Sequence, residues 1–255
     1  MTRISNIVSP IGEQIEVSPG FFISRRSLLA GLGGTLLGVM PGVRSIAALN
    51  EEMGDGLSFE QFLAQAIPVA QSLVGDTSIS GQDKYLRSIA ALASGLTDVP
   101  IPGKWNNTDQ GETPDSYRIG FNPGGDPFRV LHWRLEPGAI CRPHAHTYGN
   151  VVSIGIEGIV RVRNYEVVGG PNYEFDGTFL VRQTVDQLLV RGSINLVSLE
   201  KNYIHGFVAG PDGARGLDIT TPLKPRPAHN TPFLSIGKTP VDEFLNTYEA
   251  SWEYK

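Results

Sequence analysis

The chain has 255 residues and a formal net charge of −5, with 40% hydrophobic and 18% charged residues. This composition supports a packed core and excludes a wholly disordered chain, while the acidic balance argues against a nucleic-acid-binding protein. The single cysteine, Cys141, excludes an internal disulfide and any metal site made of several cysteines. With 30 glycines and 18 prolines, the composition favours a turn-rich β protein over a helical bundle.

The first 48 residues have the order of an export signal. Arg25 and Arg26 precede an apolar run at 28–40 that is diluted by glycines, and small residues follow at 45–48. The paired arginines and the weak apolar run resemble a twin-arginine signal. A chance arginine pair before a buried helix is the alternative. We therefore expect residues 1–48 to engage the twin-arginine export machinery and the mature protein to be periplasmic or secreted.

Residues 49–116 are predicted to form a small helical segment followed by a loop. Ser58 can cap a helix with apolar residues at helical spacing, which Pro68 should break or kink. A second helix is predicted over 82–94, with Gly95 as its stop. Residues 98–116 are rich in proline, glycine and asparagine and are predicted to be loop.

From Tyr117 onward the apolar period shortens to two, which is typical of strands. Glycine-rich and proline-rich turns separate the short apolar segments, so residues 117–255 are predicted to form a sandwich or barrel with a C-terminal extension. A short helix is expected at 241–248. The candidate strands are 117–121, 128–134, 151–156, 159–167, 188–190, 194–199, 204–208 and 214–221.

The most informative residues are three histidines. His144 and His146 are two apart in a segment that reads as extended, so both should face the same side. Joined by His205 from another strand, they can hold a divalent metal on one side and leave positions open for a substrate. A histidine pair in a surface loop beside Pro143 is the alternative.

The order of these residues resembles the two metal motifs of the cupins. Gly138 is followed by His144 and His146, then at a distance by Gly158 and a lone His205. The resemblance implies a mainly β fold, a double-stranded β-helix or jelly-roll barrel, with the helical segment before it. The glutamate that usually follows in the first cupin motif has Asn150 or Val151 in its place. The resemblance therefore implies three histidine ligands and no carboxylate, which leaves the metal its full charge and favours an anionic ligand such as a thiolate.

Among three-histidine cupins, the stretch 118–158 is similar without a gap to the cysteine dioxygenase family, with looser agreement up to Pro222. The resemblance implies ferrous iron on the three histidines, Arg118 gripping a substrate carboxylate, and O2 adding both oxygen atoms to a small thiol. Three histidines also suit zinc, manganese or nickel. By analogy with cupins, a homodimer is expected. The matching residues are Arg118, Phe128, Gly138, His144, His146, Thr147 and Gly158.

The chain also departs from that family. Val151 and Thr220 stand where many members have a crosslinked cysteine and tyrosine, and Gly216 and Asp218 stand where a serine and a histidine orient that tyrosine. These departures keep a second hypothesis open, an exported non-catalytic or sensory cupin that binds a small anion through a metal. A third and weaker one is a zinc or manganese hydrolase or isomerase.

Several other residues have two interpretations. Tyr203 is two residues before His205 and is a candidate catalytic phenol, with core packing as the alternative. Asn150 is either close to the metal or a turn residue. His132 should share a face with Val130 and is expected not to be a ligand. Cys141 is expected to be an inert residue beside the site.

Overall fold

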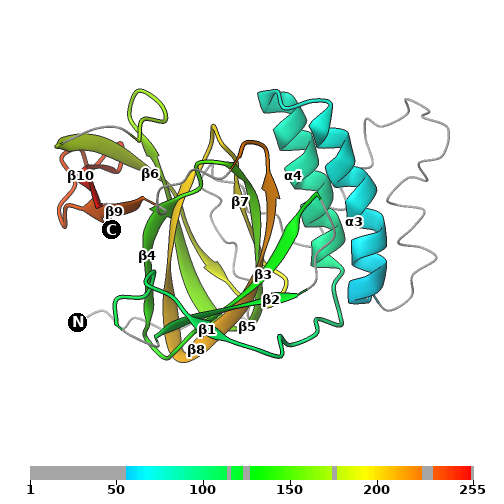
Figure 1. The fold of residues 1–255 in the computed structure, drawn as a ribbon. Helices are drawn as coiled ribbons and strands as arrows, with labels where there is room; N and C mark the ends of the chain where they lie inside the picture. Colours follow the sequence, from blue (N-terminus) through cyan, green and yellow to red (C-terminus); the bar gives the residue numbers. More distant parts are fainter. Residues whose placement is uncertain (1–55, 114–115, 123–126, 174–176, 226–231, 254–255) are drawn as a thin grey trace, which may run out of the picture.

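The computed structural model describes residues 56–113, 116–122, 127–173, 177–225 and 232–253. The predicted signal peptide therefore lies outside the described residues. Two helices lie side by side against one flank of a β barrel (Figure 1). Within the described ranges, no helix is both long and apolar enough to cross a membrane. The elements are α3 (Phe59–Val74), α4 (Ile79–Ser94), β1 (Asn106–Asn107), β2 (Tyr117–Asn122), β3 (Arg129–Leu135), β4 (Ile140–Ala145), β5 (Gly149–Val167), β6 (Thr178–Leu189), β7 (Ile194–Val197), β8 (Ile204–Pro222), β9 (Phe233–Ile236) and β10 (Thr247–Glu253).

The predicted start of α3 and the predicted end of α4 are confirmed, whereas α4 begins at Ile79, three residues before the predicted start, and α3 continues past Pro68 to Val74. Ser58 caps α3 in a capping box: its Oγ accepts the Gln61 N–H at 3.2 Å, and Gln61 Oε1 accepts the Ser58 N–H at 2.9 Å. Gly95 is the C-cap of α4, as predicted. Pro68 does not break α3, because the apolar stripe continues beyond it. The buried Ala70 and Leu73 extend that stripe, and their burial offsets the roughly 3 kcal/mol that a proline costs inside a helix.

The barrel is built around two long antiparallel strands. β5 and β8 have 19 residues each and pair from Gly149 opposite Pro222 to Tyr165 opposite Ile204. One half of this pair is flanked by β3 and β7, and the other half by β4 and β6. β10 pairs with β6 and β9, and β9 reaches β4 through the pair Phe233 and His144. The prediction of a mainly β barrel with a small helical segment before it is confirmed.

The sequence splits each of these long strands in two, whereas the structure joins the halves. The turn signals Glu157-Gly158 and Gly210-Pro211-Asp212-Gly213 lie inside β5 and β8, where the strands bend between the two flanking sets. The ladder has irregularities on both sides of Gly158. Gly158 has φ +69°, and a Cβ there would overlap the Gly213 carbonyl. Glycine therefore serves here as a bend within a strand rather than as the end of one.

Other elements differ from the prediction. The helix expected at 241–248 is a turn followed by β10, which pairs with β6 and β9. The segment expected as a strand at 188–190 is the end of the much longer β6, and β9 was not predicted. Edge pairing stabilises these segments, and such pairing leaves no local periodicity to detect.

The faces of the barrel are clearly divided. Val130, Val152 and Ile219 point outward and pack against α3 and α4 in one apolar cluster. Side chains at the alternate positions of these strands point inward. Trp133 and Phe207 belong to this second, interior cluster, and their ring centroids are 5.1 Å apart. This division decides which of the predicted site residues face the interior.

Candidate metal centre

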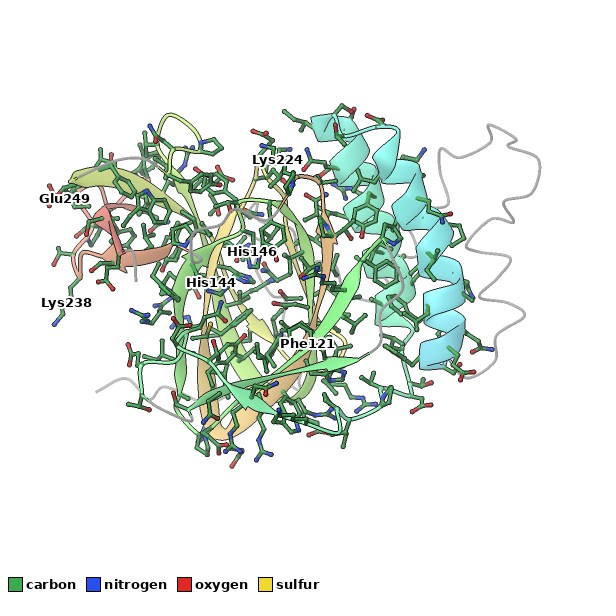
Figure 2. All side chains as sticks on the ribbon, in the orientation of Figure 1. Phe121, His144, His146, Lys224, Lys238 and Glu249 are labelled. Carbon is green, nitrogen blue, oxygen red and sulfur yellow. The ribbon has the colours of Figure 1, made fainter. Side chains whose placement is uncertain are left out.

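The structure brings the three predicted histidines together inside the barrel. His144 and His205 are directly opposite each other in the β4–β8 ladder, and His146 follows the end of β4. The candidate ligand atoms all lie within 4.8 Å of one another. The Nε2 atoms of His146 and His205 are 2.8 Å apart. Figure 2 shows His144 and His146 pointing into the middle of the barrel.

A bulge in β4 sets this arrangement. The register of β4 against β8 shifts between Cys141 and His144, so both residues face the interior although they are three apart. Pro143, which has no N–H for a ladder, lies within that shift. His144 Nδ1 lies 2.9 Å from the Arg142 carbonyl oxygen. A donated Nδ1–H fixes the tautomer in which Nε2 is free to bind a metal.

The three imidazoles are neutral at ordinary pH. Burial lowers the pKa of His144 to about 4 and lowers those of His146 and His205 well below their usual value. Neutral imidazoles carry the lone pair that a metal needs. Burial raises the pKa of the Cys141 thiol, so this neighbour of His144 is a neutral thiol, as expected.

These residues fit a divalent metal. Two nitrogens bound to one ion at about 2.1 Å lie about 3 Å apart when the angle between them is a right angle, close to the observed Nε2 separation of 2.8 Å. Within the part of the chain that the structure describes, the cluster contains no carboxylate and no cysteine ligand. The donor set is three neutral nitrogens, which suits iron, zinc, manganese or nickel.

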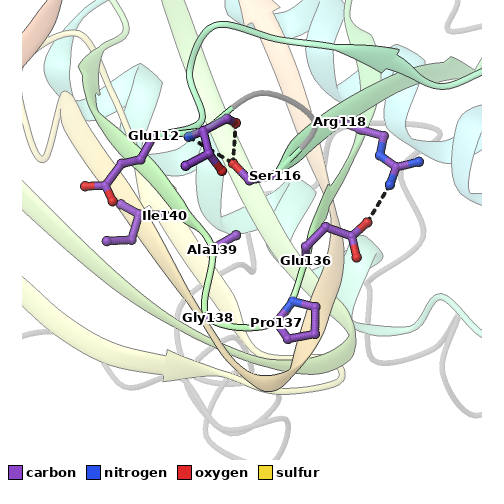
Figure 3. A pocket seen from close by; sticks show the side chains of 9 residues that line it. Glu112, Ser116, Arg118, Glu136, Pro137, Gly138, Ala139 and Ile140 are labelled. Atoms are coloured by element: carbon purple, nitrogen blue, oxygen red, sulfur yellow. Dashed lines mark hydrogen bonds and ion pairs between the residues drawn. The ribbon is translucent and has the colours of Figure 1, made fainter.

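Arg118 does not join this cluster. It is directly opposite Arg134 in the β2–β3 ladder, and Arg134 is the chain neighbour of the inward-facing Trp133. Arg118 therefore lies on the outer face. Its guanidinium donates to Glu136 Oε1 at 2.7 Å, at the rim of an open pocket of about 400 Å³ (Figure 3). This placement does not support the role of Arg118 in gripping a substrate carboxylate at the metal.

Tyr203 is also engaged elsewhere. It is 1% exposed, and its hydroxyl accepts the Val167 N–H at 2.7 Å. Its ring packs in an apolar cluster with Tyr165 and Trp252, among others. The alternation argument for Tyr203 fails because β8 begins only at Ile204. The structure therefore favours the core-packing interpretation.

Asn150 and His132 lie on the outer side of the barrel wall. Asn150 is opposite Thr221, whose hydroxyl contacts the Tyr85 hydroxyl of α4. The side chain of Asn150 therefore faces the helix rather than the histidines. His132 is fully buried, with its ring 6.3 Å from that of Trp105, and it is not part of the cluster.

The interior also contains polar residues that the sequence did not single out. Asn164 is opposite His205 in the β5–β8 ladder, and its Nδ2 donates to Asn195 Oδ1 at 2.8 Å. Asp218, opposite Ser153, accepts the Trp133 Nε1–H at 3.1 Å. Asp218 lies between Leu217 and Ile219, whereas Asn164 follows Arg163 in a strand of mixed polarity. The only available signal was a polar residue at an inward position of a buried strand, which requires a partner.

No protein-family model matches the chain, and no curated protein matches it. Among solved structures, the chain is similar to KdgF from Halomonas sp., with 14% identity over 48% of this chain and 88% of that chain and a TM-score of 0.35. It is also similar to an RmlC-like cupin from Shewanella frigidimarina, with 19% identity over 51% and 94% and a TM-score of 0.34. A third structure, of oxalate oxidase, has 13% identity over 45% and 55% and a TM-score of 0.35.

Proposed function

We propose that this protein is a metal-dependent cupin enzyme that oxidises a small thiol, such as cysteine, to a sulfinate with O2. The observation that carries the proposal is the convergence of His144, His146 and His205 in the barrel with no carboxylate among them. Three neutral ligands leave a divalent metal its full positive charge. Such a centre attracts an anionic, soft ligand, and a thiolate is both.

The reaction balances without a further co-reactant. A thiol R–SH and one O2 give the sulfinic acid R–SO2H, with both oxygen atoms added to sulfur. Ferrous iron, when bound, supplies the electrons that activate O2 for this chemistry. The chain contributes the three imidazoles, held neutral by burial, and an interior walled by the rings of Trp133 and Phe207, which limits the access of water.

The outward position of Arg118 shapes the expected substrate preference. Because its guanidinium is paired with Glu136 on the outer face, the proposal gives it no part in binding. The thiolate itself is then the main point of attachment. We therefore expect a thiol without a carboxylate, such as cysteamine, to be oxidised about as well as cysteine.

The test is metal analysis of the purified protein together with O2 uptake. Iron near one per chain, and uptake with cysteine, 3-mercaptopropionate or cysteamine, would support the proposal. His144→Ala should lose both the metal and the activity. His132→Ala is the matched control, because His132 is equally buried but lies on the outer side of the wall. Absence of thiol-dependent uptake after reconstitution with ferrous iron would refute the proposal.

One observation favours a second candidate, a non-catalytic or sensory cupin that binds a small anion through its metal. Both side chains predicted to act on the substrate, Arg118 and Tyr203, are engaged elsewhere. Metal-dependent binding of a thiolate without O2 uptake would distinguish this candidate from the enzyme.

We also propose that the protein is exported by the twin-arginine route. Arg25, Arg26 and the apolar run after them support this proposal. Replacing both arginines by lysine should retain the full-length protein in the cytoplasm. Export of the lysine variant at the normal rate would contradict the proposal.

A further inference from the structure

His205 has a second ring nitrogen, Nδ1, that does not face the other two histidines. Its Nε2 faces His146, so Nδ1 must carry the proton when Nε2 binds a metal. This Nδ1 is buried, and it has no hydrogen-bond partner among the residues that the structure describes. His144 differs, because its Nδ1 has the Arg142 carbonyl. Histidines that bind metals almost always donate their other N–H to an oxygen.

Asn164 is placed to supply that oxygen. It is the direct partner of His205 in the β5–β8 ladder, so the two side chains share the interior face with Cβ atoms about 4.5–5.5 Å apart. Asn164 is fully buried, and its Oδ1 has no partner in the described part of the chain. The buried donor, His205 Nδ1–H, and the buried acceptor, Asn164 Oδ1, therefore face the same space, and each lacks a hydrogen-bond partner.

Asn195 fixes the orientation of the Asn164 amide. Asn164 Nδ2 donates to Asn195 Oδ1 at 2.8 Å, which leaves Asn164 Oδ1 as the free atom. Asn195 Nδ2 is itself buried and without a partner among the described residues. Two donors, His205 Nδ1–H and Asn195 Nδ2–H, and one acceptor, Asn164 Oδ1, are therefore left without partners in this part of the interior. One ordered water can accept from both donors and donate to Asn164 Oδ1, which are about the three hydrogen bonds that a buried water usually makes.

We propose that Asn164 is a positioning residue of the metal centre. One buried water links the Nδ1–H of His205 to the Oδ1 of Asn164, and Asn195 holds the amide in that orientation. The interaction fixes the tautomer and the ring of His205 so that Nε2 points to the metal. This inference depends on the metal site of the proposed function but not on its reaction.

The experiment measures metal affinity, not turnover. Zn²⁺ and Co²⁺ are titrated into the metal-free full chain in competition with a chelator. Asn164→Leu, which keeps the volume and removes the acceptor, should weaken binding by about 10- to 100-fold. Asn164→Asp, which keeps the acceptor, should restore the affinity. Asn150→Leu is the matched control, because Asn150 is an equally buried asparagine of the same strand that faces α4.

A second readout reports the hydrogen bond itself. In the zinc-loaded protein, NMR should show a slowly exchanging Nδ1–H proton of His205 that Asn164→Leu loses and Asn164→Asp retains. Thermal unfolding of the metal-free variants shows whether each one folds. If Asn164→Leu does not fold, the affinity and the NMR signal of Asn164→Asp still test the proposal.

The outcomes separate this inference from the proposed function. Metal affinity of Asn164→Leu within about threefold of wild type, or an equal loss in Asn150→Leu, would overturn the role of Asn164. Failure of the wild type to bind metal would overturn the centre and the inference together. Wild-type protein that binds metal but takes up no O2 with thiols would overturn only the proposed function.

Discussion

The carboxyl group of Asp218 should make the stability of the metal-free protein fall as the pH rises. Asp218 is 5% exposed in the barrel interior. Burial raises its pKa to about 7, although hydrogen bonds from Ser153 and Trp133 act in the opposite direction. The folded protein therefore keeps a proton that the unfolded chain releases. Asp218→Asn keeps an oxygen that can accept the Trp133 N–H but cannot ionise.

The size of the effect follows from the two pKa values. The unfolded group titrates at 3.8 and the folded group at about 7. Between these values the folded state binds more protons, so the free energy of unfolding falls by about 1.4 kcal/mol per pH unit. This contribution is fully present below about pH 4. By about pH 7, roughly 4 kcal/mol has been lost.

Urea denaturation of wild type and Asp218→Asn, in the presence of a chelator, measures this loss. The two proteins should be about equally stable near pH 4, and the variant should be more stable by about 4 kcal/mol near pH 8. Asp186→Asn is the control of opposite sign. Although burial raises the pKa of Asp186, hydrogen bonds and charges from Arg161 and Arg163 lower it overall. Its contribution is therefore present at neutral pH and lost as the pH falls. Parallel pH profiles for wild type and Asp218→Asn would refute the reasoning.

Three further outcomes are expected. Tyr203→Phe leaves the buried Val167 N–H without its acceptor, so it should cost about 1–3 kcal/mol in urea denaturation without changing metal content; lost metal with unchanged stability would contradict this. Arg118→Ala should leave the KM for cysteine unchanged, because Arg118 faces outward. A KM raised only for thiols that carry a carboxylate would show that Arg118 does bind the substrate carboxylate. Gly158→Ala forces a side chain onto φ +69° and against the Gly213 carbonyl, so we expect a loss of more than about 2 kcal/mol in thermal or urea unfolding, and a stable variant would show that the bend can relax.

Local signals predicted the helices well. The capping residue Ser58 and the stop Gly95 mark real helix ends because they satisfy backbone groups of their own turn. The helix does not end at Pro68, because the apolar stripe beyond it is buried, which a sequence window does not show. The expected helix at 241–248 failed for a related reason. Its residues lead into β10, which pairs with β6, a strand distant in the sequence, and with β9, a strand that was not predicted.

The metal site could be predicted only in part. His144 and His146 are two apart, and both reach the cluster as predicted, although His146 lies just after the end of β4. The same rule failed for Tyr203, because the strand begins after it. For Arg118, similarity of sequence suggested a position at the metal, but similarity does not say which face of a strand is inside. The ladder from Arg118 through Arg134 to the neighbouring Trp133 decides that question.

The sequence by itself determined a mainly β chain, two capped helices and a histidine pair, His144 and His146, spaced to share a metal. These features follow from periodicity, caps and spacing, which act over a few residues. Only the tertiary structure decided that β5 and β8 run unbroken through their glycine bends, that Asn164 lies opposite His205, and that Arg118 lies outside. Strand register and the choice of inner face depend on partners distant in the sequence, because a period of two specifies that neighbours alternate but not which of them is buried.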